Sequence, residues 1–143
     1  MTTEFREVWT TPPTPPASAE DRAAVEAVVR DYYEGWYTAD ADRMARALHR
    51  DLAKRAFGMG PDRAPEIAHT TAEEMISATR AGVGRARAGH RLDIRIAELG
   101  GGIASVNVSA DHYVDLLHLV KTPEGWRIIN ALWRYADGHG PRA

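Results

Sequence analysis

The fold of this chain is decided by the stretch YVDLLHLV at residues 113–120, by its partner WRIINALWRY at 126–135, and by the turn TPEG at 122–125 between them. Both stretches are rich in the branched and aromatic side chains that strands favour. Proline and glycine in the short segment between them are typical of a reversing turn. We therefore predict two long antiparallel strands joined by a hairpin.

Upstream of these strands, apolar and polar residues alternate with a period of two. Apolar side chains at 92, 94 and 96 alternate with polar ones, and the alternation resumes at 104, 106 and 108 after the glycines at 100–102. Alternation of this kind is typical of a strand with one buried face. The chain from about residue 90 onward is therefore predicted to form an antiparallel meander.

The N-terminal half has a helical period instead. Capping signals at Ser18, Asp40 and Thr70-Thr71 predict three helices. Residues that share a stripe on these helices are Tyr32 and Trp36 on the first and Met75 and Thr79 on the third. Between the second and third helices, residues 52–57 suggest a strand that ends at Gly58. Helices followed by a meander indicate an α+β fold, not a doubly wound parallel sheet.

Length and composition fit one soluble domain. The chain has 143 residues, 44% of them hydrophobic, and a formal net charge of -2. We expect a proline-rich arm at 1–17, one domain at 18–136 and a flexible tail at 137–143. The weak negative charge predicts no nucleic acid or membrane partner, and the absence of cysteine suits a cytoplasmic location.

Several stretches carry a resemblance to a known superfamily. They are VVRDYYEGWYTAD at 28–40, ALHRD at 47–51, YVDLLHLVK at 113–121 and GWRIIN at 125–130. Together with the element order they resemble the nuclear-transport-factor-2-like superfamily, in particular its lumazine-binding, SnoaL-like branch. The resemblance implies a cone-shaped, strongly curved antiparallel or mixed sheet that wraps with three helices around an apolar pocket, a cystatin-like fold. Because isomerases, dehydratases, cyclases and non-catalytic binders share this scaffold, the resemblance implies fold more than activity.

The most specific part of the resemblance is to ketosteroid isomerase, an enzyme with this fold. Asp115 matches the position of that enzyme's protonated aspartic acid, and Tyr32 matches its phenol donor, a pair that the enzyme uses to bind an enolate oxygen. The position of its general base falls on Phe57, which cannot accept a proton. In the SnoaL-like cyclases the acidic residue of the last strand would fall near Trp133. Neither the general base of ketosteroid isomerase nor the acidic residue of the cyclases is therefore present at its usual position.

Asp115 has two readings from its place in the strand. Strand parity puts it on one face with Tyr113, Leu117 and Leu119, so in an apolar pocket its carboxyl would be neutral and could donate a hydrogen bond. Alternatively, it is a structural group bonded to a tyrosine, to His49 or to backbone. The sequence leaves both readings open.

The remaining candidate site residues follow from the resemblance and from strand parity. His49 looks like the histidine that many superfamily members carry before the first strand, and it is a candidate acid or base. The residues predicted to contact a ligand are Trp36, Phe57, Met75, Thr79, Ala131, Trp133 and Tyr135. On the last strand, parity groups three of these with Ile129. No spacing typical of a metal site occurs, and we predict neither metal nor cofactor.

Two functional hypotheses result. The first is a pocket protein for a small aromatic or polycyclic molecule, acting as an isomerase, cyclase or dehydratase with Tyr32 and Asp115 as hydrogen-bond donors. The second is a non-catalytic binder or dimeric interaction module. We also expect a homodimer formed through the convex sheet face, with apolar residues at 104, 106 and 108 and at 114, 116 and 118.

Overall fold

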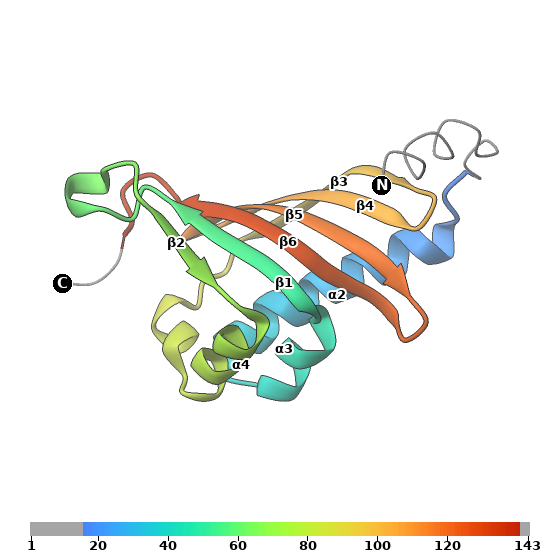
Figure 1. Ribbon diagram of the computed structural model, residues 1–143, viewed down its shortest axis with the longest axis horizontal. Helices are drawn as coiled ribbons and strands as arrows, with labels where there is room; N and C mark the ends of the chain where they lie inside the picture. The colour runs from blue at the N-terminus through green and yellow to red at the C-terminus, as the bar shows by residue number, and fades with distance from the viewer. Residues whose placement is uncertain (1–15, 141–143) are drawn as a thin grey trace, which may run out of the picture.

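The computed structural model describes residues 16–140, and these form three α-helices and a six-stranded sheet (Figure 1). In chain order the elements are α2 (Ala19–Thr38), α3 (Ala41–Ala47), β1 (Leu48–Phe57), η1 (Pro61–Arg63), β2 (Ile67–Thr70), α4 (Ala72–Arg80), η2 (Val83–Arg87), β3 (Leu92–Gly100), β4 (Ile103–Ala110), β5 (Tyr113–Thr122) and β6 (Gly125–Tyr135). The strand order is β2-β1-β6-β5-β4-β3, in which only β1 and β6 run parallel. The predicted α+β fold with a mixed sheet is therefore confirmed.

The helices begin where the sequence predicts. Ser18 accepts a hydrogen bond from the backbone N–H of Asp21 at the start of α2, and Asp40 accepts one from Arg43 at the start of α3. Thr71 and Glu74 form a reciprocal capping box at α4, which satisfies backbone donors that the first helical turn leaves unpaired.

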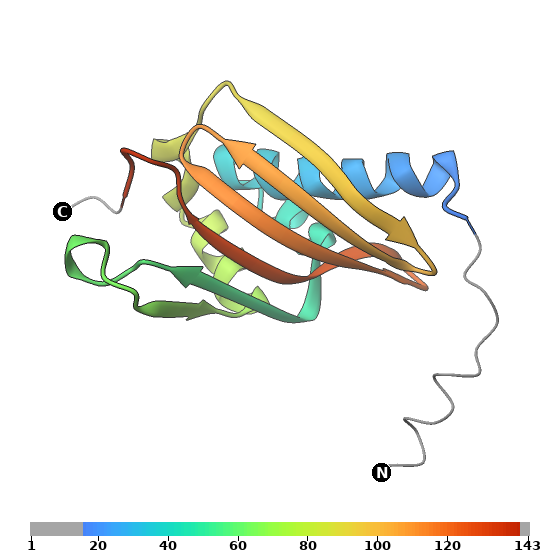
Figure 2. The same cartoon turned by 90° about the horizontal axis from the view of Figure 1, so that it is seen from above.

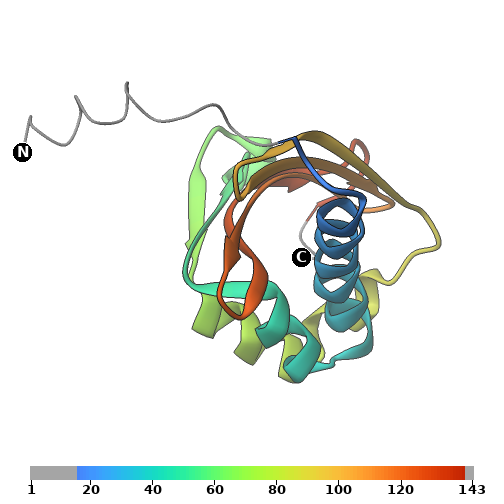
Figure 3. The same cartoon turned by 90° about the vertical axis from the view of Figure 1, so that its right-hand side faces the viewer.

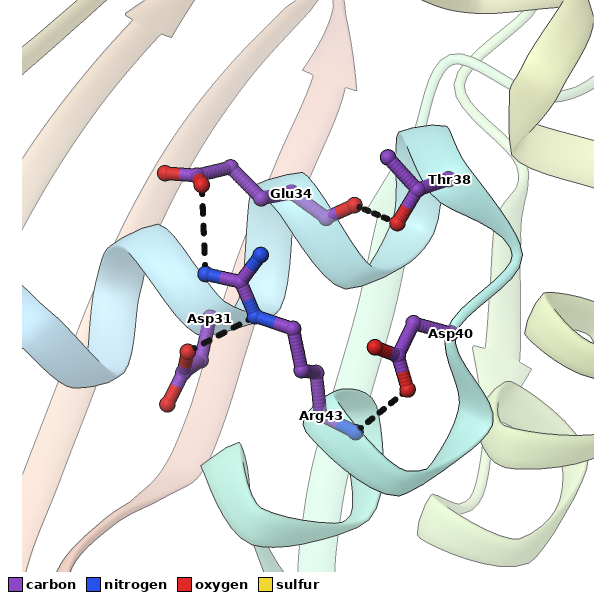
Figure 4. Close-up of polar contacts among 5 residues, drawn as sticks. All are labelled: Asp31, Glu34, Thr38, Asp40 and Arg43. Carbon is purple, nitrogen blue, oxygen red and sulfur yellow. Dashed lines mark hydrogen bonds and ion pairs between the residues drawn. The ribbon is translucent and has the colours of Figure 1, made fainter.

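The corner between α2 and α3 sets the course of β1. Arg43 on α3 donates to Asp31 (2.9 Å) and Glu34 (3.1 Å) on α2 (Figure 4). The helices meet at Gly35, where an added Cβ would lie 3.1 Å from the backbone nitrogen of Met44. The close contact at Gly35 and the ion pairs of Arg43 hold α3 against α2, and β1 begins directly after α3.

The sheet is curved, and its concave face turns toward the helices. Figures 2 and 3 show the strands arching over α2, with α3 and α4 below the opening of the arch. The core lies between these layers and includes Val25, Val29, Met44, Leu117 and Ile128, none of them more than 1% exposed. The concave side of the sheet is therefore where a cavity can form.

Two predictions about sheet faces need correction. Ala104, Val106 and Val108 pair with Leu119, Leu117 and Asp115 and are buried in the core, not on the convex face. Ile129 does not share the face of Ala131, because a register irregularity in the β5–β6 pairing at this point turns Ile129 outward. Parity counted across an irregularity gives the wrong face.

The ends of the chain fall largely outside the described residues. Of the predicted arm, Pro16 forms an isolated bridge with Gly100. Within the predicted tail, Arg63 donates to the carbonyl of His139 and Arg87 to that of Gly140. Residues 16–140 contain no helix with the length and apolar character that a bilayer crossing requires.

Candidate ligand-binding cavity

A cavity of about 430 Å³ lies between the concave face of the sheet and the helices. This volume is in the range of small-molecule binding sites, which are mostly apolar with a few convergent polar groups. Its lining comes from α2, α4, η2, β1, β2, β5, β6 and the segment after β1, and includes Tyr32, Tyr33, Trp36, Lys54, Met75, Tyr113, Asp115, Trp133 and Tyr135. Six of these nine residues are aromatic.

The aromatic side chains support one another through defined ring contacts. Trp133 packs edge to face against Tyr113 (5.6 Å between centroids) and against Tyr135 (5.0 Å). Trp36 on α2 donates its indole N–H to the Tyr113 hydroxyl at 3.1 Å. Rings held in this way offer large, rigid faces against which a flat molecule can stack.

Asp115 is one of the most deeply buried polar groups of the cavity wall. Its side chain points inward from β5 and the residue is 3% exposed. The Tyr33 hydroxyl donates a hydrogen bond to Oδ2, whereas Oδ1 is buried without a hydrogen-bond partner among the described residues. Burial raises the pKa of the Asp115 carboxyl, and the opposing effects of Lys54 and Tyr33 do not cancel this shift. Burial thus disfavours the charged form, as the first sequence reading supposed, while the hydrogen bond from a tyrosine is the contact that the structural reading supposed.

Lys54 is a cavity residue that the sequence analysis missed. It lies on β1 and is 6% exposed, and its Nζ donates to the Tyr32 hydroxyl. Nζ also lies 5.2 Å from the Tyr32 ring centroid and 5.0 Å from that of Trp133. Burial lowers the pKa of the Lys54 amine, and Asp115 offsets this only in part. Strand parity with the buried Leu52 and Ala56 was the signal that could have found it.

The tyrosine hydroxyls act as neutral donors. Burial raises the pKa of Tyr32 and Tyr33 well above the ordinary phenol value. Because Tyr32 accepts its hydrogen bond from Lys54, its own proton remains available to a molecule in the cavity. The structure thus pairs Asp115 with Tyr33, while Tyr32 is paired with Lys54.

Four predicted site residues lie outside the cavity lining. Phe57 is 50% exposed, because the inward parity of β1 belongs to Leu52, Lys54 and Ala56. His49, near the start of β1, accepts a hydrogen bond at Nδ1 from the backbone of Asp51 at 3.0 Å. The other two are buried in the core: Thr79, whose hydroxyl donates to the Met75 carbonyl at 2.7 Å, and Ala131. We therefore leave these four out of the site.

Trp133 supplies a second buried polar atom without a partner. Its Nε1 is buried and makes no hydrogen bond among the described residues. Trp133 stands directly opposite Asp115 in the β5–β6 register. Residues opposed in this way hold their side chains side by side on one face. Two unpaired polar atoms, Asp115 Oδ1 and Trp133 Nε1, therefore belong to neighbouring side chains on the wall of one cavity.

The cavity has no arrangement suited to a metal ion. No cluster of three or more histidine, aspartate and glutamate side chains within residues 16–140 could hold one. The polar groups of the wall include the Asp115 carboxyl, the Trp133 indole N–H and the Tyr32 hydroxyl. The Lys54 amine and the Arg87 guanidinium also line the cavity.

This architecture is that of the nuclear-transport-factor-2-like proteins. A family model described as "Putative lumazine-binding" matches residues 20–134, and the chain belongs to that family. No curated protein matches the chain.

Solved structures with the same fold are similar over most of the chain. One is an NTF-2-like protein of unknown function from Silicibacter pomeroyi, at 19% identity and a TM-score of 0.66, covering 85% of this chain and 100% of that one. Another is an NTF2-like protein of unknown function from Shewanella baltica, at 16% identity and a TM-score of 0.66, covering 87% and 100%. A third, from Novosphingobium aromaticivorans, is described as NTF2-like with a cystatin-like fold, at 14% identity and a TM-score of 0.60, covering 96% and 88%. Identities this low show the fold alone.

Proposed function

We propose that this protein binds a flat aromatic or polycyclic small molecule that carries a carbonyl-type oxygen. The observation that carries the proposal is a pair of buried polar atoms without a partner among residues 16–140, Asp115 Oδ1 and Trp133 Nε1, whose residues line the cavity. A buried polar group without a partner costs free energy, and a ligand atom that pairs with it removes that cost.

The polarity of these atoms defines the ligand's polar group. Trp133 Nε1 can only donate. In the neutral acid favoured by burial, Oδ2 of Asp115 already accepts from Tyr33, so the acid proton is expected on Oδ1. Two neighbouring donors fit one acceptor, and the oxygen of a ketone, amide or enolate accepts two hydrogen bonds. The aromatic rings around them fit the flat remainder of the molecule.

A matched pair of probes tests this proposal. 2-Naphthamide has a carbonyl oxygen and does not condense with amines, whereas 2-isopropenylnaphthalene has nearly the same shape without the oxygen. Two hydrogen bonds worth about 0.5–1.5 kcal/mol each should make the amide bind roughly tenfold tighter or more, measured by equilibrium dialysis. Equal affinities for both probes, or no binding of either, would contradict the proposal.

Two variants locate the effect. Trp133→Phe keeps a ring and removes the indole N–H, so the preference for the amide should shrink. Trp36→Phe is the matched control, because its N–H is already engaged by Tyr113 and belongs to the opposite wall. The preference for the amide should persist in Trp36→Phe.

A catalytic role is the second candidate function. Donors placed on a carbonyl oxygen also stabilise the enolate that forms when a neighbouring C–H is deprotonated. The donors Asp115 and Tyr32 on the cavity wall favour an isomerase, cyclase or dehydratase. Proton exchange with deuterium at the carbon beside the carbonyl of 2-acetylnaphthalene, accelerated by wild type and not by Asp115→Ala, would distinguish this role from binding alone.

A further inference from the structure

The chain uses lysine at only two of its 18 basic positions, Lys54 and Lys121, and the two lie in opposite environments. The Lys121 side chain is 54% exposed and its Nζ forms an ion pair with Asp21 at 2.9 Å. Lys54 is buried in the cavity wall, and among residues 16–140 it forms no salt bridge. Arginine, which stays protonated, serves the other basic positions.

The surroundings of Lys54 favour a free amine. Its nearest neighbours are the Tyr32 hydroxyl and the rings of Tyr32 and Trp133. The two ring contacts favour the ammonium, but desolvation by burial is the largest effect and lowers the pKa of the Lys54 amine. A lysine that is desolvated in an apolar pocket is a nucleophile toward carbonyl carbon.

An acid stands on the same wall. Lys54 pairs with Ala131 on β6, and Asp115 lies on β5 beyond it, so a single strand separates the amine and the carboxyl. Both side chains line the cavity. Asp115 raises the pKa of Lys54 and Lys54 lowers that of Asp115, although burial outweighs both effects. The amine of Lys54 and the carboxyl of Asp115 thus line one cavity.

We propose that Lys54 is a nucleophile that condenses with an aldehyde or ketone group of the cavity ligand to form an imine. This inference rests on the proposed binding of an aromatic carbonyl compound. It adds a covalent site on this chain and narrows the ligand class to aldehydes and ketones.

The step balances without a further reactant. The lone pair of Nζ attacks the carbonyl carbon, the C=O π electrons move to oxygen, and one proton passes from the nitrogen to that oxygen, giving a carbinolamine. The C–O bond then breaks while the Asp115 carboxyl protonates the departing oxygen, and one water leaves. Asp115 recovers its proton from the nitrogen, so the amine and the carbonyl compound yield the imine and water.

Reductive trapping tests the proposal. The full chain is incubated at neutral pH with 2-naphthaldehyde and sodium cyanoborohydride, which converts an imine into a stable secondary amine. Intact mass spectrometry should show one naphthylmethyl group per chain, and peptide mapping should place it on Lys54. Burial lowers the pKa of Lys54, whereas Asp21 raises that of Lys121, so the free-amine fraction is larger at Lys54 and labelling should be faster there than at Lys121.

Variants make the result specific. Lys54→Met and Lys54→Arg should both lose the rapid labelling, because neither side chain offers a primary amine. Lys121→Met is the matched control and should label at the wild-type rate. Labelling that is equal at the two lysines or confined to the N-terminal amine, or that persists in Lys54→Met, would overturn the proposal.

Failure of the imine proposal can be distinguished from failure of the binding proposal. A protein that binds 2-naphthamide but gives no adduct at Lys54 would overturn the imine and leave the proposed function standing. A protein that binds neither 2-naphthamide nor 2-naphthaldehyde would overturn both.

Discussion

Tyr33 on α2 donates its hydroxyl proton to Oδ2 of Asp115 on β5, a buried bond between residues 82 positions apart in the chain. The bond fixes the carboxyl against the helix through Oδ2, and Oδ1 is buried without a hydrogen-bond partner among the described residues. The same bond therefore stabilises the fold and positions a carboxyl group of the cavity wall. Removing the Tyr33 hydroxyl or the Asp115 carboxyl should change both the stability of the protein and its cavity.

Tyr33→Phe should destabilise the protein, because Asp115 Oδ2 would lose its donor in a buried place. The expected loss in the free energy of unfolding is about 1–3 kcal/mol, measured by urea denaturation. Tyr37→Phe is the matched control, since the Tyr37 hydroxyl is buried without a partner within residues 16–140 and its removal should cost little. Equal costs for the two variants would show that the Tyr33–Asp115 bond adds no stability.

The pH dependence of stability should reveal the charge state of Asp115. Its pKa in the folded protein is raised above the ordinary 3.8 by burial, so its contribution is fully present below that value and is lost as pH rises through the folded pKa. Asp115→Asn keeps a donor of similar shape. The advantage of wild type over this variant should therefore shrink as pH rises from about 4 to about 8.

Asp21 provides a control with the opposite sign. Hydrogen bonds from Lys121 and Trp126 lower the pKa of Asp21, so its contribution is present above its unfolded pKa and is lost as pH falls. The advantage of wild type over Asp21→Asn should grow with rising pH. If Asp115→Asn followed the same trend as Asp21→Asn, the neutral-acid assignment would be refuted.

Lys54→Met should raise thermodynamic stability, because it replaces a desolvated amine with an apolar side chain of similar length. We expect a gain of about 1 kcal/mol or more at neutral pH, with the greatest benefit at low pH where the amine must be protonated. Chemical denaturation of wild type and variant at two pH values measures this. A loss of stability at both would show that the amine is well compensated in its site.

The convex face of the sheet should mediate a homodimer. Leu116 and Leu132 are directly paired on β5 and β6 and are 45% and 50% exposed, which leaves an exposed apolar pair on this face. Light scattering at micromolar concentration should give the mass of a dimer, and Leu132→Arg should give a monomer. A monomeric wild type would show that this face has another role.

Much of the fold was predictable because capping signals and the change of period are local. Asp115 was placed on the inner face because the parity of β5 runs without interruption along its apolar stretch. The same rule misplaced Ile129, because the irregularity in the β5–β6 pairing depends on both strands and leaves no mark in β6 alone.

The cavity's polar residues were only half predictable. Lys54 was overlooked because a lysine within a strand usually faces solvent, although its neighbours at 52 and 56 are buried. Tyr33 was overlooked because it follows Tyr32 on α2, and only the wrapping of the sheet around this helix buries two successive residues. Which tyrosine meets which partner depends on long-range geometry.

Nuclear magnetic resonance of the tryptophan indole N–H groups tests the central claim most directly. ¹⁵N-labelled protein is titrated with 2-naphthamide and with 2-isopropenylnaphthalene, so that ring-current effects common to both probes cancel in the comparison. We predict that the amide-specific shift is concentrated at Trp133 and moves its N–H proton to lower field, as a new hydrogen bond requires. Trp126, which donates to Asp21 away from the cavity, should not respond. An amide-specific shift absent from Trp133, or equal at Trp126, would contradict the account.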